Sequence, residues 1–376
     1  MKILFISMPS IHAIRWIENL KDSKHELYWF DVLNKGNLET LNSVKQFHNL
    51  GKRKLPYLKG EFFLSKKAPR LYDFCKFFLE ITPNESLKNI INEIRPDCIH
   101  SFEMQGCSYP ILKTMEQFPQ IRWVYSCWGN DLFFYKNFPQ HLKKIKRVLK
   151  RVNFMHSDCY RDYDIAEQLG FKGRYLGVIP TGGGYHLKSF TNSHLEVESR
   201  KIILIKGYDH IFGRAINVIK AIEEIYKNYN DYEFVVFGAH KVVIDYINVK
   251  KLPFKVFDRN GLTQLELLDL MGKAFIYIGN NISDGMPNTV LEAMIMGAFP
   301  IQSNPGNATS EIIEDGVNGL LINDPENIQE IRDLILKALC SKSMIMSANS
   351  INYRLTYEKL DYEFNRTKIN EIYDSL

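Results

Sequence analysis

The segment from Ser283 to Gly297, SDGMPNTVLEAMIMG, places two carboxylates beside a predicted helix start. Asp284 lies in the loop after a predicted strand, and Glu292 lies about a turn into the helix that follows Pro287. Carboxylates accept paired hydrogen bonds from vicinal hydroxyls, and the free N–H groups of a first helical turn attract phosphate. Gly285 allows a ligand to approach the backbone closely. The segment therefore predicts a site for a ligand with hydroxyls and phosphates, although each feature alone is also common in structural helices.

A second segment, KGYDHIFGRA, carries two cations. Lys206 ends a predicted strand, and Arg214 begins the next predicted helix. Two cations at the carboxyl end of a strand beside the Asp284 loop would neutralise a diphosphate leaving group. The alternative is an ordinary pair of surface cations.

The elements that must position these residues follow an α/β pattern, because short apolar runs alternate with amphipathic stretches along the whole chain. The expected strands are 2–8, 26–31, 97–102, 122–126, 153–156 and 174–179, then 201–205, 233–237, 254–257, 275–279 and 299–303. Expected helices include 213–227, 263–271, 287–296 and 326–339. The predicted fold class is α/β with two doubly wound domains, 1–188 and 200–350, and a polar linker over 185–200. Since ligands collect outside the carboxyl ends of parallel strands, two such domains facing each other would form a central cleft.

Length and composition agree with two globular domains. The chain has 376 residues, of which 45% are hydrophobic and 24% charged. No apolar run approaches the roughly 20 residues of a membrane-spanning helix, and the first residues lack a small-residue cleavage site, so we expect a cytoplasmic protein. The six cysteines show no metal-ligand spacing, and we expect buried, reduced thiols.

Basic and acidic residues are distributed unevenly along the chain. Residues 1–190 carry 29 basic and 18 acidic side chains, and the remainder carries 19 and 25. Two basic stretches stand out: 52–76 with eight positive and two negative residues, and 136–151 with seven positive and none negative. Such stretches suit anionic lipid head groups or an acidic substrate. In the second stretch Leu142, Ile145, Leu149 and Val152 recur at helical spacing, which favours a core-packed helix with a solvated basic face. Nucleic acid is disfavoured, because the acidic second half would repel phosphates and no binding module is visible.

The segment from Ser283 onward, with the following AFPIQSNPGNATSEIIEDGVNGLLI, resembles the donor-binding signature of retaining glycosyltransferases of family 4. That family has two Rossmann-like domains facing a cleft, the GT-B architecture. Its Glu-x7-Glu pattern appears here as Asp284-x7-Glu292, and KGYDHIFGRA is similar to the basic KGY…GRA motif of one subgroup. Further likeness lies in PDCIHSF, SCWGNDL and VIPTGGG.

The resemblance implies retaining transfer of a hexosyl or N-acetylhexosaminyl group from a nucleotide sugar, UDP-linked in many such relatives, to a glycan or polyprenyl-diphosphate-linked acceptor in cell-surface polysaccharide biosynthesis. Glu292 would hold the ribose, Asp284 the donor sugar, and Lys206 with Arg214 the diphosphate, without a metal. The backbone of the loop and helix start would meet the sugar and phosphates at Gly285, Met286, Pro287, Asn288 and Thr289. A C-terminal helix over about 355–376 would complete the first domain, and the basic first domain would attach peripherally to the inner face of a membrane.

Several residues depart from the family pattern. Asp284 is one methylene shorter than the usual glutamate, which bears on donor identity. On the acceptor side His12 follows the first strand, Trp128 stands where many relatives carry a histidine, and Asp131 is a weaker candidate. A packing role is the alternative for His12 and Trp128. The Asp-x-Asp at 162–164 resembles a metal site of another glycosyltransferase architecture, but acidic residues in a first helical turn are the favoured interpretation.

Two other functions stay open. A sugar-nucleotide epimerase or hydrolase of the same architecture would turn over without an acceptor, and a non-catalytic scaffold would bind a nucleotide sugar without turnover.

Overall fold

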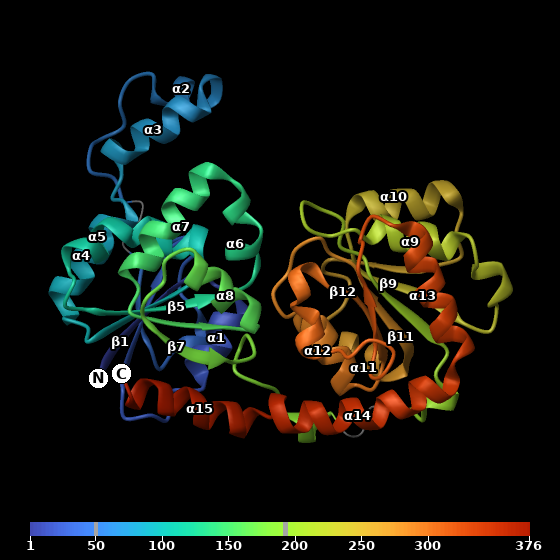
Figure 1. The fold of residues 1–376 in the computed structure, drawn as a ribbon. Coiled ribbons are helices and arrows are strands. Elements are labelled where there is room, and N and C mark those ends of the chain that lie inside the picture. The colour runs from blue at the N-terminus through green and yellow to red at the C-terminus, as the bar shows by residue number, and fades with distance from the viewer. Residues whose placement is uncertain (49–51, 191–194) are drawn as a thin grey trace. The chain divides into compact units, whose positions relative to one another are not determined.

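The computed structural model describes residues 1–48, 52–190 and 195–376, so 191–194 of the expected linker lie outside the described residues. The chain forms two compact units. The first comprises 1–157, 162–183 and 366–376, and the second comprises 158–161 and 184–365. Both are α/β units with a parallel sheet (Figure 1).

The first unit has a seven-stranded parallel sheet of order β3-β2-β1-β4-β5-β6-β7. Its strands are β1 (Lys2–Ser7), β2 (Glu26–Asp31), β3 (Lys45–Phe47), β4 (Cys98–Phe102), β5 (Arg122–Cys127), β6 (Phe154–Ser157) and β7 (Arg174–Val178). Its helices are α1 (Ile11–Glu18), α2 (Glu61–Lys67), α3 (Pro69–Leu79), α4 (Pro83–Ile94), α5 (Leu112–Gln117), α6 (Asn130–Phe133), α7 (Pro139–Arg151), most of α8 (Tyr160–Gln168), and α15 (Tyr362–Asp374) from Arg366 onward.

The second unit has a six-stranded parallel sheet of order β10-β9-β8-β11-β12-β13. Its strands are β8 (Ile202–Lys206), β9 (Glu233–Ala239), β10 (Lys255–Asp258), β11 (Ala274–Gly279), β12 (Phe299–Ser303) and β13 (Leu320–Ile322). Its helices are α9 (Ala215–Glu223), α10 (Lys241–Lys250), α11 (Gln264–Lys273), α12 (Asn288–Ile295), α13 (Ile328–Cys340) and α14 (Lys342–Leu360).

Each sheet is buried on both faces, as all-parallel sheets require. Alternate residues of β1 enter two different cores: Leu4 and Ile6 pack with α4, α5 and α7, whereas Ile3 and Phe5 pack with α1 and α15. In the second unit the side chains of β8 alternate in the same way. Ile203 and Ile205 pack on the side of α9, α10 and α13, and Leu204 packs on the side of α11 and α12. This explains why the strands read as continuous apolar runs. The predicted doubly wound α/β class is confirmed.

The eleven expected strands are confirmed to within about two residues at each end. Sequence reasoning missed β3 and β13, which are three-residue strands at the sheet edges. The expected helix at 287–296 begins one residue later, because Pro287 is the N-cap of α12. The Asp-x-Asp segment lies in α8 with Asp162 in its first turn, as expected.

The C-terminal helix is tied into the first unit by a buried polar network. The Tyr373 hydroxyl of α15 accepts a 2.9 Å hydrogen bond from Trp16 Nε1 and contacts His100 Nδ1 at 2.5 Å. His100 Nε2 lies 2.6 Å from Ser126 Oγ, which in turn contacts His156. The last residues of the chain therefore complete the core that its first strands begin.

The six cysteines differ in exposure. Cys98, Cys107, Cys127 and Cys159 are buried as expected, but Cys75 is half-buried and Cys340 is exposed, so the expectation of buried thiols is not met at these two residues. Within 1–48, 52–190 and 195–376, no helix has both the length and the apolar character that crossing a lipid bilayer requires.

Candidate functional site

The two sequence motifs meet where the strand order of the second sheet reverses. β8 and β11 are neighbours, with Ile205 paired to Ile278, and the helices that follow them pack on opposite faces of the sheet. Lys206 is the last residue of β8, and the loop after β11 carries Asp284 to the start of α12. In open parallel sheets this switch point, at the carboxyl edge, is where ligands bind.

Asp284 is held in place by its own loop. One carboxylate oxygen accepts from Asn281 Nδ2 at 2.8 Å, and the other accepts from the Gly285 N–H at 3.0 Å. Burial raises the pKa of Asp284, and the positive charge of Lys206 partly offsets this effect. Lys206 of one motif therefore lies close enough to Asp284 of the other to act on its charge.

The two cations of the site have different surroundings. The Lys206 side chain is nearly buried, with its ammonium 4.8 Å from the centre of the Tyr208 ring. Arg214 is the N-cap of α9, and its Nε donates to Glu326 Oε1 at 2.5 Å while Nη1 donates to the His210 carbonyl at 3.0 Å. The charge of Arg214 is thus already shared with a carboxylate.

The start of α12 presents backbone N–H groups, and hydrogen bonds hold the side chains of its first two residues. Asn288 Oδ1 accepts from the Tyr185 hydroxyl at 3.0 Å, and Thr289 Oγ1 lies 2.8 Å from the Tyr277 hydroxyl. Further along the helix, Glu292 is only 6% exposed and its Oε1 accepts from Gln264 Nε2 at 2.8 Å. A preorganised helix start of this kind suits an anion.

Close packing explains the composition of the loop between Asp284 and α12. A Cβ on Gly285 would lie 2.5 Å from Asp158 Oδ1, so only glycine fits without a shift. Arg161 Nη2 donates to the Asp284 carbonyl at 2.8 Å, and Met286 is buried in the core of the second unit. Both Asp158 and Arg161 group with the second unit.

Sequence reasoning missed a group of rings beside Lys206. Tyr208 stacks on His240 with ring centres 5.5 Å apart, and His210 lies 5.1 Å from His240. Arg259 lies over the Tyr208 ring at 5.6 Å. Burial, followed by the charges of His240 and Lys206, lowers the pKa of His210. These residues come from loops after three different strands. Only Tyr208 and His210 lie within the KGYDHIFGRA motif, so the sequence gives no local indication that His240 and Arg259 join them.

The acceptor-side candidates gather at the carboxyl edge of the first sheet. The His12 ring meets the Trp128 ring edge-on, with ring centres 5.9 Å apart, and the backbone N–H of Trp128 donates to Asp131 Oδ1 at 3.0 Å. Burial, with a smaller effect of Arg15, lowers the pKa of His12 from 6.5 to about 4. His12 is therefore neutral at pH 7.

Asp131 is a buried acceptor of several hydrogen bonds from its own unit. It accepts from the Tyr125 hydroxyl at 2.6 Å, the Met104 N–H at 3.1 Å and the Trp128 N–H. These contacts organise the loop that carries Trp128, so Asp131 has a clear structural role.

A second carboxylate, missed in the sequence, lies close to Asp131. Glu103 follows β4 with a positive φ of 67°, and its carboxylate accepts from the Gln105 and Gly106 N–H groups. Burial and the negative charge of Asp131 raise the pKa of Glu103.

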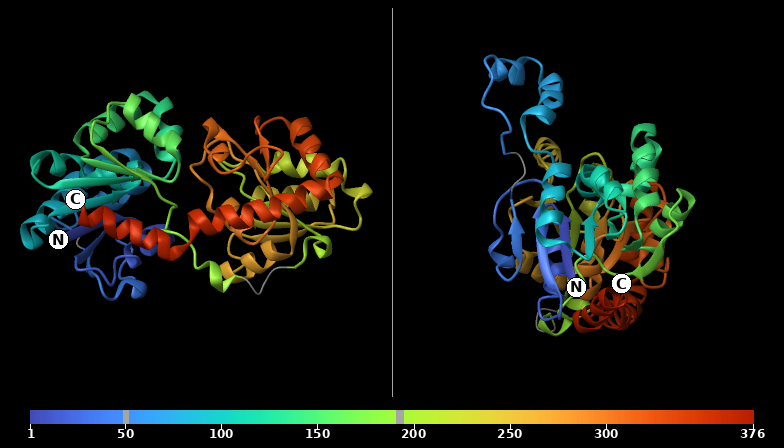
Figure 2. Two further views of the ribbon diagram at one scale, coloured as in Figure 1. Left: turned by 60° about the horizontal axis from the view of Figure 1, so that its bottom comes forward. Right: turned by 90° about the vertical axis from the view of Figure 1, so that its left-hand side faces the viewer.

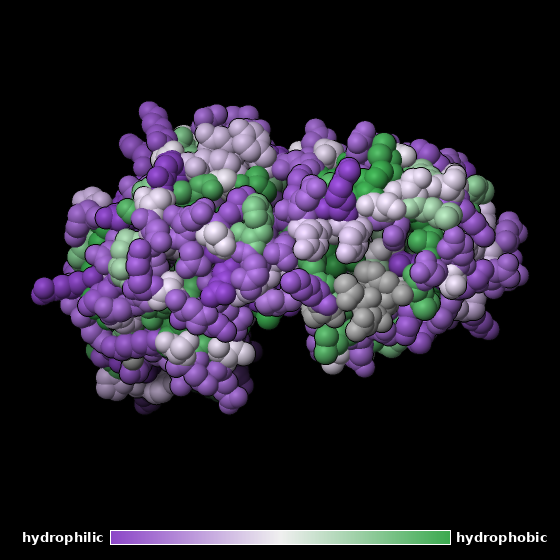
Figure 3. Space-filling view, turned by 90° about the horizontal axis from the view of Figure 1, so that it is seen from below, coloured by the Kyte–Doolittle hydropathy of each residue, from purple (hydrophilic) through white to green (hydrophobic). Residues whose placement is uncertain are grey.

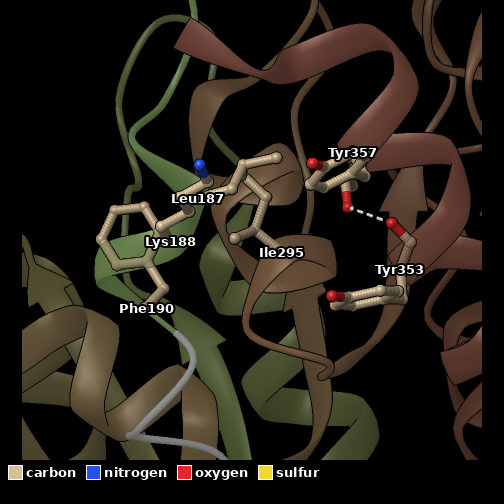
Figure 4. Close-up of a pocket in the computed structure, with 7 residues that line it drawn as sticks. Leu187, Lys188, Phe190, Ile295, Tyr353 and Tyr357 are labelled. Atoms are coloured by element: carbon tan, nitrogen blue, oxygen red, sulfur yellow. Dashed lines mark hydrogen bonds between the residues drawn. The ribbon is translucent and has the colours of Figure 1, made fainter.

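One small cavity lies away from the switch point. It measures about 70 Å³ and is lined by Leu187, Lys188 and Phe190 together with residues of α12 and α14 (Figure 4). Small-molecule sites usually span about 300–1,000 Å³, so this cavity does not fit a nucleotide.

The fold is that of a two-domain α/β protein, and its candidate ligand site lies at the carboxyl edge of the second sheet. Family models for "Glycosyl transferase 4-like" and "Glycosyl transferases group 1" match residues 2–159 and 189–354. Together these two matches cover most of the chain. The protein is a glycosyltransferase with the GT-B fold. No curated protein sequence matches it.

Solved structures with the same fold cover nearly the whole chain. Anabaena HepE, in complex with UDP and glucose, is 16% identical with a TM-score of 0.70, covering 100% of both chains. Sucrose-phosphate synthase of Thermosynechococcus elongatus is 15% identical with a TM-score of 0.74, covering 100% of this chain and 98% of its own. A glycosyltransferase from Rickettsia africae is 15% identical with a TM-score of 0.67, with the same coverage.

Proposed function

We propose that the protein is a retaining glycosyltransferase of family 4 that transfers a hexosyl or N-acetylhexosaminyl group from a UDP-linked sugar to a glycan or polyprenyl-diphosphate-linked acceptor in cell-surface polysaccharide biosynthesis. The observation that carries the proposal is the meeting of Lys206, Asp284 and the start of α12 at the switch point. The complexes of HepE with UDP, UDP-glucose, and UDP and glucose support a uridine nucleotide as the donor.

In this proposal the second unit binds the donor. Glu292, oriented by Gln264, accepts from the ribose hydroxyls, and Asp284 accepts from hydroxyls of the transferred sugar. The N–H groups at the start of α12 and the Lys206 ammonium face the diphosphate, with Arg214 as a second cation. No metal is required for this charge balance.

The transfer breaks the bond between the anomeric carbon and the diphosphate oxygen and forms a bond to the acceptor oxygen on the same face of the sugar. The acceptor proton passes to the departing diphosphate, so a dedicated general base is not needed. Lys206 stabilises the charge that develops on the leaving group. The first unit binds the acceptor with His12 and Trp128, and its basic surface attaches the enzyme to the inner face of an anionic membrane.

The proposal is tested by binding and turnover in sequence. Thermal shift and calorimetry with UDP, GDP, ADP and their sugars, with magnesium or with EDTA, identify the donor, because a ligand of the native state raises the melting temperature. We expect a shift with UDP that EDTA leaves unchanged. Glu292→Gln should weaken UDP binding roughly tenfold, since it replaces hydrogen bonds to a charged acceptor. Glu358→Gln, at an exposed position on α14, is the control.

Turnover then separates the alternatives. With the donor identified, NMR of the product should show an anomeric configuration retained from the donor. Equal UDP affinity in wild type and Glu292→Gln would refute the site, and donor consumption without an acceptor would favour an epimerase or hydrolase.

A further inference from the structure

A helical hairpin, residues 52–81, stands away from the sheet of the first unit (Figures 1 and 2). It contains α2 and α3, and it joins the unit at its base, where the Lys54 N–H donates to the Leu79 carbonyl at 2.8 Å and the Ile81 N–H to the Lys52 carbonyl at 2.9 Å. Lys54 also forms a 2.6 Å ion pair with Glu85 of α4. The hairpin thus has a fixed base and a projecting body.

The interior of the hairpin is polar. The carboxylate of Glu61, only 7% exposed, accepts from both terminal nitrogens of Arg53 at 2.6 and 2.8 Å. The same carboxylate accepts from the Tyr72 hydroxyl at 3.2 Å and the Leu58 N–H at 3.1 Å. Among the side chains that the structure describes, a charged centre at Glu61 and Arg53 joins the parts of the hairpin.

Many of its large apolar side chains are exposed. Tyr57 is 80% exposed, Phe62 73% and Phe63 66%. Leu55, Leu58, Leu71, Phe77 and Phe78 are also exposed. Proteins in water seldom gather this many large apolar side chains on one surface element, and where they do the patch marks an interaction site. By contrast, the face of the molecule in Figure 3 is mostly hydrophilic, with hydrophobic atoms in small separate groups.

The same hairpin is strongly basic on its outside. Lys52, Lys54, Lys59, Lys66, Lys67 and Arg70 are exposed, whereas Glu61 is buried against Arg53 and Asp73 is the exposed acid of 52–76. Several cations lie over rings, such as Lys66 over Phe62 at 4.4 Å and Arg53 over Tyr57 at 4.2 Å. Rings and long basic side chains in one layer match the boundary between lipid head groups and acyl chains.

Helix α7 shows that charge alone does not produce this arrangement. It is equally basic, but its apolar residues Ile145, Val148 and Leu149 are buried in the core of the first unit. In the second basic stretch, 136–151, Phe138 is exposed at 39%, whereas the hairpin exposes Tyr57, Phe62 and Phe63 at 66–80% beside its cations.

We propose that the α2–α3 hairpin docks onto an anionic lipid bilayer, with its rings inserted at the head-group boundary and its lysines and arginine on anionic head groups. Charge favours this occupant over a second copy of the chain, because two hairpins of the same positive sign repel each other. The inference deepens the membrane attachment in the proposed function by naming the element and the lipid class. Its test needs neither donor nor acceptor, so the two can fail separately.

The test is co-sedimentation of the full-length protein with vesicles of phosphatidylcholine alone or mixed with phosphatidylglycerol. We expect binding to the mixed vesicles that falls as salt is raised. Phe62→Ser/Phe63→Ser should weaken binding more than about tenfold, because each buried Phe contributes about 1.5–3 kcal/mol. Lys66→Gln/Lys67→Gln should weaken it by about tenfold or more, at about 1 kcal/mol per charge. Lys143→Gln/Lys146→Gln on α7 removes the same charge and should bind like wild type.

Each contrary result overturns the proposal in a recognisable way. Wild-type protein that stays in solution with anionic vesicles refutes docking, and ring variants that bind normally refute insertion. Dimerisation abolished by Phe62→Ser/Phe63→Ser, without vesicle binding, would assign the rings to a second copy. Because the substituted side chains are exposed, the melting temperature of these variants without ligand should match that of wild type, which excludes misfolding.

Discussion

At the scale of single residues, Lys206 and Arg214 are not equivalent, although the sequence motif pairs them. Arg214 shares its charge with Glu326 at 2.5 Å, whereas Lys206 is nearly buried and acts electrostatically on Asp284. A buried cation interacts with a bound anion more strongly than an exposed one, because water screens it less. Lys206 should therefore contribute more to diphosphate binding.

We expect Lys206→Met, which keeps most of the side-chain volume, to weaken UDP binding by about ten- to a hundredfold, since a hydrogen bond to a charged group contributes about 1.5–3 kcal/mol. Calorimetric titration with UDP measures this change. Lys201→Met, at the exposed residue before β8, is the matched control. A Lys206 variant that binds UDP as the control does would remove Lys206 from the donor site.

At the scale of elements, the position of Glu292 depends on the start of α11. Thr263 caps that helix in a capping box with Glu266, and the next residue, Gln264, donates to Glu292. The cap fixes the first turn and so fixes the residue that orients a proposed ribose ligand. This link joins two consecutive helices through side chains 28 residues apart, and no local pattern reveals it.

Thr263→Ala should lower the free energy of unfolding by about 1 kcal/mol, the usual cost of losing an N-cap side chain. It should also weaken UDP binding severalfold, because Gln264 loses its fixed position. Thr82→Ala is the matched control, since Thr82 forms the same capping box with Glu85 at the start of α4 in the first unit. Chemical denaturation and UDP titration of both variants make the comparison. Equal UDP affinities in the two variants would contradict the role of Gln264.

The sequence predicts helices and strands well where the apolar periodicity is strong. It predicts poorly those features that depend on contacts between residues far apart in the sequence. The long central strands follow from apolar runs, but β3 and β13 have three residues each, too few for a periodic signal. The motifs of Lys206 and Asp284 were visible because each lies within one loop. The ring group of Tyr208 and His240 was not, because it forms only when separate strands of the sheet come together.

At the scale of the whole molecule, the first unit is completed only when the last helix returns to the first strands. Tyr373 and Trp16, 357 residues apart, share a buried hydrogen bond next to His100 and His156. The His156 ring also stacks on Trp16, with ring centres 4.2 Å apart. Burial lowers the pKa of His156 from 6.5 to about 3, and it lowers the pKa of His100 well below its ordinary value. Closing the chain therefore places two neutral histidines in the core.

This network makes stability depend on pH in a direction that can be worked out. In the unfolded chain both histidines take up protons below about pH 6.5, whereas in the folded chain they stay neutral, so the unfolded state binds more protons as pH falls. We expect the free energy of unfolding to drop from pH 7 to pH 5 by about 2 kcal/mol for each of the two, at about 1.4 kcal/mol per pH unit below the unfolded pKa. Urea denaturation at the two pH values measures it. His156→Gln should remove about 2 kcal/mol of the drop, the contribution of that one group, even where it lowers stability at pH 7. His186→Gln, at an exposed ring, is the control. A drop that His156→Gln leaves unchanged would show that other groups set the pH dependence of this fold.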